Sequence, residues 1–270
     1  MTTASPRKAI VFLGSGRITG ALVAGLRLAK YDRPIIVHDR NPGKLLRLKK
    51  QYGVVVEPNL PRAMEKAGLL IIAVRPDSVS DLLRAIGNIH RPLNAVSLAA
   101  GIPLSKLRAR LGPPVRWARA MPSPVCRTGH GLTALTFERA FPPKAKAEVR
   151  SLFQKVGTVL EIPESQFDAF TVTYSSSHGY HALAALAASA QKLGLSRKMA
   201  LTAAAHALAD AIVSWRESGI TLDKLLQEAA TPGGIAASTM NAMDSSGYGR
   251  SIQQGLRAGM ARARKNAKRA

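Results

Sequence analysis

Short apolar runs alternate with amphipathic stretches over the first 160 residues of the chain. The runs Lys8–Leu13 and Leu69–Val74 have the length and the branched side chains of buried strands, whereas apolar positions between Val79 and Ile86 recur at helical spacing. Further helices are expected at Ile18–Leu28 and Gly43–Gln51, and further strands at Pro34–His38, Val54–Glu57, Asn94–Ala99, Val115–Met121, Leu132–Phe137 and Thr158–Ile162. Continuous apolar strands that alternate with helices predict an α/β fold, with a doubly wound, mostly parallel sheet covered by helices on both faces.

The pattern changes after Pro163, where β-branched runs disappear and Ala, Leu and Met recur at helical spacing. The helices expected there are Phe167–Leu193, Arg197–Ser218, Leu222–Ala230, Ile235–Met243 and Ser251–Lys268. The run Ala182–Ala188 makes the first of them apolar on nearly every side, and such helices are normally buried against other helices. We therefore expect a sheet domain over residues 1–163, and an all-α helical domain over residues 164–270 that forms a dimer interface and ends in a basic tail.

The chain of 270 residues has 39 Lys and Arg against 16 Asp and Glu, a formal net charge of +23. Its 46% of hydrophobic residues supports a large core, which excludes a disordered chain. Such a positive field attracts the phosphates of nucleic acids or membrane surfaces, but the same charge also arises when Lys and Arg only solvate outer helix faces. The densest cluster, Arg257–Arg269, lies at the C-terminus, where frayed basic tails are common. We favour the second interpretation and expect no nucleic-acid partner.

No apolar run approaches the roughly 18 residues that cross a bilayer, and Met1–Lys8 lacks the apolar stretch of a leader segment. A soluble, cytoplasmic protein without a membrane partner is expected. The single cysteine, Cys126, cannot form an internal disulfide and is expected to be a buried apolar residue rather than a nucleophile. His178 and His181 stand three residues apart, but no carboxylate or cysteine lies at ligand spacing, so no metal is expected.

A glycine-rich turn lies between the first expected strand and the first expected helix. In that context Gly14 allows a tight turn, Gly16 lets the backbone approach a pyrophosphate, and the N–H groups at the helix start attract its charge. Thr19 occupies the third glycine position of such motifs, and Gly20 comes one residue late. The turn predicts dinucleotide binding, with an inert strand–turn–helix as the alternative. The residues of the turn expected to bind the cofactor are Gly14, Ser15, Gly16, Arg17 and Ile18.

Asp39 ends the second expected strand, where an acid normally binds the adenine ribose 2′-hydroxyl and selects NAD. Arg40 follows at once, and an arginine there holds a 2′-phosphate instead. Both residues are therefore cofactor candidates that argue for opposite cofactors, and both can also be solvated or cap the next helix.

Six segments resemble successive motifs of the Δ1-pyrroline-5-carboxylate reductase family, in the same order and at similar spacing. They are Phe12–Gly16, Ala73–Pro76, Ser97–Ile102, Arg119–Pro122, Pro163–Asp168 and Thr231–Gly234, and the resemblance extends over nearly the whole chain. The resemblance implies a Rossmann-type N-terminal domain, a homodimer interleaved through the C-terminal helices, and a larger ring of dimers. It also implies proline biosynthesis by reduction of a cyclic imine with NADPH, or with NADH as the alternative.

The resemblance further implies roles for residues outside the glycine turn. On the nicotinamide side it implies Ala73, Val74, Arg75, Pro76 and Ala100, and at the junction of cofactor and substrate Ala120, Met121 and Pro122. The loop Thr231–Gly234 places backbone N–H groups at the start of an expected helix, which suits a substrate carboxylate, while an ordinary turn between helices is the alternative. The residues expected to bind the substrate are Ser176, Thr231, Gly233, Gly234, Ile235 and Ala236.

The departures from the family pattern gather in the substrate half. Where the family reads Ser-Gly-Ser-Gly-Pro-Ala-Tyr, residues Tyr174–Tyr180 keep only Ser176 and Tyr180. The Thr that follows Thr-Pro-Gly-Gly in the family is replaced by Ile235 and Ala236, a Glu is replaced near Ile220, Val-Lys-Pro has become Val74–Pro76, and Met-Pro-Asn ends in Ser123. Losing a hydroxyl that contacts a buried carboxylate typically costs about 1.5–3 kcal/mol of binding. Such clustered losses indicate another substrate or reduced activity.

The reaction itself needs few side chains, because a protonated imine is already electrophilic and positioning supplies most of the catalysis. Ser176, His178 and Tyr180 are the candidate catalytic residues. His178 can protonate an imine or pair with a carboxylate, and a surface histidine is the alternative.

Three functions are therefore compared. The first is an NAD(P)H-dependent reductase of Δ1-pyrroline-5-carboxylate, and the second is a reductase of the same fold with another imine or carbonyl substrate. The third is a degenerate, basic dinucleotide-binding protein with an acidic or nucleic-acid partner.

Overall fold

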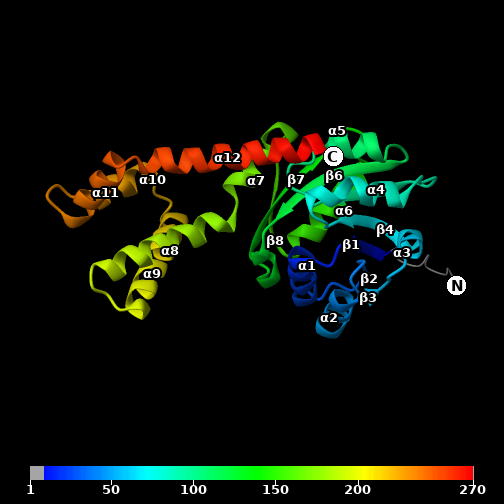
Figure 1. Cartoon of the computed structure of the whole chain (residues 1–270), viewed down its shortest axis with the longest axis horizontal. Helices are drawn as coiled ribbons and strands as arrows, with labels where there is room; N and C mark the ends of the chain where they lie inside the picture. Colours follow the sequence, from blue (N-terminus) through cyan, green and yellow to red (C-terminus); the bar gives the residue numbers. More distant parts are fainter. Residues whose placement is uncertain (1–8, 270) are drawn as a thin grey trace. The chain divides into compact units, whose positions relative to one another are not determined.

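The computed structural model describes residues 9–269 (Figure 1). The segment Met1–Lys8 lies outside the described residues. It includes Lys8, which was expected to begin the first strand, and it is the segment expected to lack a leader sequence. Within the described part of the chain, no helix is both long and apolar enough to span a membrane.

One sheet of eight strands forms the first part of the fold. Its strands are β1 (Ala9–Leu13), β2 (Ile35–His38), β3 (Val55–Val56), β4 (Ala67–Ile72), β5 (Leu93–Ser97), β6 (Val115–Pro122), β7 (Gly131–Phe137) and β8 (Gly157–Glu161). They lie in the order β3-β2-β1-β4-β5-β6-β7-β8, and all neighbours are parallel except β6 and β7. The predicted mostly parallel sheet is confirmed, although β3 has only two residues and β4 begins and ends two residues before the expected run.

Helices cover both faces of the sheet (Figure 1). They are α1 (Arg17–Leu28), α2 (Pro42–Tyr52), α3 (Leu60–Lys66), α4 (Val79–Ile86), α5 (Leu104–Arg110) and α6 (Pro143–Gln154), with short 3-10 helices η1 (Pro76–Ser78) and η2 (Pro124–Thr128). Alternate residues of β1 enter two different cores, because successive side chains of a strand point to opposite faces. Phe12 packs with α1, α2 and α6, whereas Val11 and Leu13 pack with α3, α4 and α5.

The chain after residue 163 is helical, as expected. It forms α7 (Glu164–Thr173), α8 (Ser176–Lys192), α9 (Arg197–Ser218), α10 (Leu222–Ala229), α11 (Ile235–Ser245) and α12 (Tyr248–Arg269). The expectation of one helix over Phe167–Leu193 was wrong, because the chain breaks at Tyr174 and Ser175. The Ser175 side chain caps α8 by accepting from the Ser177 N–H, which gives the start of a new helix its missing acceptor.

The contacts divide the described chain into two units. The first runs to Tyr174 and takes in the residues from Gly259 onward, and the second is Ser175–Ala258. The domain boundary expected after residue 163 falls at the start of α7. Whether residues 1–163 and 164–270 are separate folding domains stays a prediction.

Candidate cofactor site

The turn between β1 and α1 brings two strand ends into direct backbone contact. Gly14 has φ +110°, and a Cβ on this residue would lie 2.6 Å from the carbonyl oxygen of Ala73, which follows β4. The Gly14 N–H donates to the His38 carbonyl at 2.8 Å, and the Ala73 N–H donates to the Leu13 carbonyl at 2.8 Å. Only glycine fits at position 14, since both the positive φ and the close backbone exclude a side chain.

Gly16 has the opposite surroundings. It is the N-cap of α1, and a Cβ on it would meet no protein atom within 4 Å. Helix α1 has no side-chain cap and no acid in its first turn, so its first N–H groups are free for a ligand. Open space in front of uncapped N–H groups fits the pyrophosphate of a dinucleotide.

Thr19, at the third glycine position of the motif, stabilises the turn with its side chain. Its side chain is fully buried, and its hydroxyl donates to the Gly14 carbonyl at 2.7 Å. Gly20 faces Leu48 of α2, with a Cβ placed at an ordinary contact of 3.6 Å. The departure from the glycine motif therefore adds a hydrogen bond that holds the turn.

Asp39 follows β2, as predicted, and its carboxylate holds the glycine turn. Its Oδ2 accepts from both the N–H and the hydroxyl of Ser15, at 2.7 and 2.6 Å, and its Oδ1 accepts from the Asn41 N–H at 2.8 Å. Burial acts to raise the pKa of Asp39, but these hydrogen bonds and the charge of Lys44 outweigh it, so the pKa lies below its ordinary value. Arg40, next in the chain, is exposed.

The other cofactor candidates come to the same edge of the sheet. Ile72, Ser97 and Arg119 are aligned by the parallel register of β4, β5 and β6, so the residues after them meet at the carboxyl ends of these strands. The Leu98 N–H donates to the Ile72 carbonyl at 2.9 Å, which ties the β5 loop to the end of β4. The candidates at this edge are Ala73, Val74, Arg75, Pro76, Ala100, Ala120, Met121 and Pro122.

Arg119 is a residue of this edge whose contacts sequence reasoning missed. It is 1% exposed, and its guanidinium lies 2.6 Å from Asp168 Oδ1, 3.5 Å from Glu164 Oε1 and 4.2 Å from the centre of the Phe167 ring. Its Nε is buried without a hydrogen-bond partner. The signal was present, because Glu164 and Asp168 stand four residues apart on one helix face and a buried arginine needs such partners.

The substrate and catalytic candidates lie in the second unit. Ser176, His178 and Tyr180 share the first turns of α8, and all three are exposed. The His178 N–H donates to the Ser175 carbonyl at 3.0 Å, as in the first turn of a capped helix. Because these side chains are exposed, burial does not fix their orientation toward a substrate.

The segment from Thr231 to Ala236 forms a tight turn into α11. The Gly234 N–H donates to the Thr231 carbonyl at 2.9 Å, so it is used within the turn and is not a free donor for a carboxylate. Gly234 caps α11 without a side-chain bond, which leaves the N–H groups of Ile235 and Ala236 at the open start of the helix. The expected anion site therefore rests on these N–H groups, although their side chains lack the hydroxyl. Gly233 lies inside the turn, and the Ile235 side chain is 89% exposed.

Cys126 is fully buried in η2, and burial raises its pKa to about 12. Gly25 of α1 presses against the Cys126 carbonyl, where any Cβ would collide with it. The prediction that Cys126 is buried is confirmed, and the raised pKa fits a side chain that is not a nucleophile. Among residues 9–269, the structure shows no group of three or more His, Cys, Asp or Glu side chains that could hold a metal.

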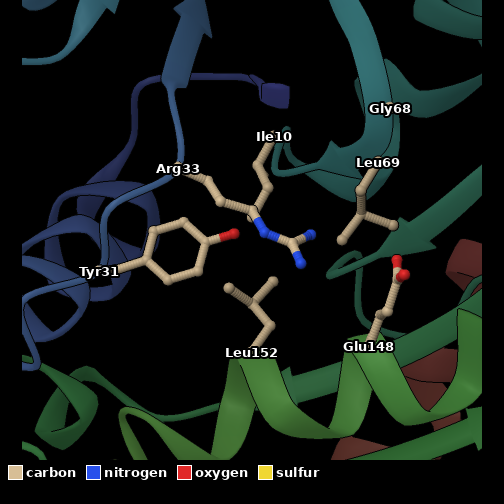
Figure 2. A pocket seen from close by; sticks show the side chains of 7 residues that line it. All are labelled: Ile10, Tyr31, Arg33, Gly68, Leu69, Glu148 and Leu152. Carbon is tan, nitrogen blue, oxygen red and sulfur yellow. The ribbon is translucent and has the colours of Figure 1, made fainter. Parts of the chain in front are cut away.

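The cavity drawn in Figure 2 lies away from this edge. It measures about 290 Å³, and the side chains of Tyr31 and Arg33 point into it beside Leu152 of α6. Ile10 and Leu69, which also line it, are paired near the amino ends of β1 and β4. The cavity is therefore at the opposite end of the strands from the glycine turn.

The fold and this edge define a Rossmann-type, dinucleotide-binding α/β protein with an added helical region. The chain is 34% identical to the pyrroline-5-carboxylate reductase of Thermus thermophilus over 242 residues, which are 87% of this chain and 89% of that protein. It is 29% identical to the pyrroline-5-carboxylate reductase of Mycobacterium tuberculosis, over 94% of this chain and 95% of that protein. The chain belongs to the pyrroline-5-carboxylate reductase family.

Two family models match separate parts of the chain. The model described as NADP oxidoreductase coenzyme F420-dependent matches residues 9–101, and the model described as pyrroline-5-carboxylate reductase dimerisation matches residues 164–266. The fold also resembles the Plasmodium falciparum pyrroline carboxylate reductase solved with NADP bound, at a TM-score of 0.86 and 18% identity over 98% of this chain and 100% of that one. The Streptococcus pyogenes 1-pyrroline-5-carboxylate reductase gives a TM-score of 0.87 at 21% identity, over 95% of this chain and 98% of that one.

Proposed function

We propose that this chain reduces Δ1-pyrroline-5-carboxylate to L-proline with a nicotinamide cofactor, as an oxidoreductase acting on C=N in proline biosynthesis. The observation that carries the proposal is the match to the Thermus thermophilus reductase over 87% of the chain. The reaction adds a hydride to the imine carbon and a proton to the imine nitrogen, so each turnover uses one reduced cofactor and one proton.

The cofactor residues act by binding and orientation. A bound nicotinamide cofactor supplies the hydride, and we assign its pyrophosphate to the turn Gly14–Ile18, where a Cβ on Gly16 would meet open space. We assign the nicotinamide to the segment Ala73–Pro76 with Ala100, and the meeting point of cofactor and substrate to Met121 and Pro122. These assignments rest on their shared place at the carboxyl ends of β1, β4, β5 and β6.

The substrate residues are proposed on the helical unit. The open N–H groups of Ile235 and Ala236 suit the substrate carboxylate, with Thr231, Gly233 and Gly234 shaping the turn that presents them. The second cluster is Ser176, His178 and Tyr180 at the start of α8. Of these, His178 is the candidate to protonate the imine, because an imidazole is the side chain that most often transfers protons in catalysis.

NADPH is the cofactor we propose, with NADH as the lesser substrate. The Asp39 carboxylate already accepts three hydrogen bonds from the protein, which leaves it little capacity to accept the ribose hydroxyls of NADH. Arg40 beside it is exposed and can hold a 2′-phosphate.

Steady-state kinetics of Arg40→Ala test this preference. The variant should raise the KM for NADPH by about tenfold, which is the loss of one charged hydrogen bond, and leave the KM for NADH nearly unchanged. Equal effects on both cofactors would rule out the 2′-phosphate role.

We further propose a homodimer formed by residues 164–270, because a dimerisation model of the family matches 164–266 and large apolar side chains of the second unit are exposed. Examples of these side chains are Leu193, Met199, Ile212, Trp215 and Leu222. A ring of such dimers and a cytoplasmic location are parts of the same proposal.

The direct test is oxidation of NADPH and NADH by the purified protein with pyrroline-5-carboxylate, and with piperideine-6-carboxylate alongside. A turnover near ~10 s⁻¹ with pyrroline-5-carboxylate is the expected result. Cofactor binding without reduction of either imine would favour the second candidate, a reductase of the same fold for another imine or carbonyl substrate. This second candidate is favoured by one observation: Ile235 and Ala236 lack the hydroxyl that the family has after Thr-Pro-Gly-Gly.

A further inference from the structure

The C-terminal end of α12 is packed against the first unit. The basic cluster Arg257–Arg269 is therefore helical, in agreement with the helix expected over Ser251–Lys268. Ala263 is 5% exposed and is the buried residue of this helix. Gly101, at φ +75°, lies directly against it, and a Cβ on Gly101 would fall 2.7 Å from the Ala263 carbonyl oxygen and 2.8 Å from its Cα. The helix backbone therefore rests on the loop backbone, which only small residues permit.

Two further residues on the same helix face complete the contact. Asn266 donates from Nδ2 to the Ala100 carbonyl at 3.2 Å. Gly259 lies against Val172 of α7, where a Cβ would meet Val172 Cγ1 at 3.0 Å. Positions 259, 263 and 266 have the spacing of one helix face. The basic residues between them that are exposed are Arg262, Arg264 and Lys265.

The loop held by this helix end is the β5–α5 loop of the cofactor edge. It starts with Leu98, whose N–H donates to the Ile72 carbonyl, and Ile72 is followed by Ala73, which contacts Gly14. The loop is thus one strand away from the glycine turn. Figure 1 shows the end of α12 in the region of α5, the helix that follows this loop.

We propose that residues 259–269 position the Ala100–Gly101 loop for the cofactor. The inference rests on the proposed function, since it assumes that this edge binds NADPH. Ala263 and Asn266 are positioning residues, because they touch the loop. A loop that the helix already holds loses less conformational entropy when the cofactor binds, so affinity is higher. The basic cluster is then the solvated face of a packed helix.

The test compares two variants with two matched controls on the same helix. Asn266→Ala removes the hydrogen bond to Ala100, and Ala263→Leu pushes the helix off Gly101. The controls Lys265→Ala and Ala261→Leu make the same kinds of change at exposed positions. Titration of each protein with NADPH, without imine, measures the cofactor Kd. We expect Asn266→Ala to raise the Kd by about three- to tenfold, Ala263→Leu to raise it further, and the controls to stay within about twofold.

A second readout separates positioning from general stability. Amide hydrogen exchange of residues 98–103, measured without cofactor, should quicken in both variants and not in the controls. Wild-type NADPH affinity in both variants, with or without a lower unfolding temperature, would overturn the inference. Wild-type protein that binds NADPH but does not reduce pyrroline-5-carboxylate would overturn the proposed substrate alone.

Discussion

Two glycines in the same turn, Gly14 and Gly16, show how one residue can be needed for folding and its neighbour for ligand binding. Gly14 is required by the protein itself, since a side chain there would strike the Ala73 carbonyl. Gly16 is not required by any described neighbour, and its φ of −72° suits every residue type. If a methyl group at Gly16 weakens cofactor binding, the cause must therefore be a clash with the bound cofactor and not with the protein.

Paired alanine substitutions test this difference. Gly16→Ala should change the free energy of unfolding by less than about 1 kcal/mol, and should weaken NADPH binding by about tenfold or more because the methyl group enters the pyrophosphate position. Gly14→Ala should lower the free energy of unfolding by more than about 2 kcal/mol, from the positive φ and the backbone clash. Urea unfolding and NADPH titration measure the two effects. Unchanged NADPH affinity in Gly16→Ala would place the pyrophosphate elsewhere.

Asp39 gives the glycine turn a pH dependence of known sign. Because its pKa is lowered in the folded protein, Asp39 stabilises the fold above the ordinary carboxyl pKa of about 4, and this stabilisation is lost as the pH falls through the lower folded value. Asp39→Asn should therefore be less stable than the wild type at neutral pH. The difference in unfolding free energy should shrink as the pH falls below about 4. A difference that stays constant down to about pH 2 would show that the carboxylate charge is not involved.

At the scale of elements, the contact of Arg119 with α7 fixes a helix to the carboxyl end of β6. A buried guanidinium that loses one of its two carboxylates is left with uncompensated charge. Asp168→Asn should therefore lower the free energy of unfolding by about 3 kcal/mol.

The matched control is Glu161→Gln, which removes the exposed ion pair of Arg150 with Glu161. It should cost less than about 1 kcal/mol, because solvent screens exposed pairs. Chemical denaturation of both variants gives the comparison. Equal losses would mean that burial does not set the strength of the Arg119 contact.

The elements that could be predicted from the sequence are those whose apolar residues form a clear run or recur at a regular spacing. All eight strands were expected, since continuous apolar runs in a parallel sheet are distinctive. The break between α7 and α8 was missed, although Ser175 is a typical helix-capping residue, and a tertiary contact also holds the chain there. The Tyr174 hydroxyl, which donates to Ser123 Oγ at 3.0 Å and accepts from the Leu132 N–H at 3.0 Å, fixes the chain at that point.

The cofactor site could be predicted from the sequence where it is formed by backbone groups at strand ends. The glycine turn and Asp39 follow from their place after β1 and β2, whereas the hydroxyl of Thr19 and the use of the Gly234 N–H within its own turn depend on three-dimensional contacts. The packing of Asn266 on Ala100 joins residues 166 positions apart, and no local pattern reveals it.

At the scale of the whole molecule, the second unit exposes apolar side chains that a partner subunit would cover. Leu193 is 87% exposed, and Met199 and Trp215 are 59% and 46% exposed. Covering such surface is a major source of stability in obligate dimers.

A dimer that stabilises the fold makes its thermal midpoint depend on protein concentration. Over a range of about a hundredfold, the Tm should rise with concentration, and sedimentation should report twice the chain mass of 28.7 kDa for the dimer, or a larger even multiple of it for a ring of dimers. A concentration-independent Tm together with a monomer mass would contradict the dimer.

The burial of Cys126 has a use in experiments on this protein. Since it is the single cysteine and its thiol has a pKa of about 12, maleimide reagents near neutral pH should leave the folded chain unlabelled. A cysteine introduced at any exposed position would then carry a spin label or fluorophore at one defined place. One such cysteine in each of the two units would allow distance measurements between them without removal of the native thiol.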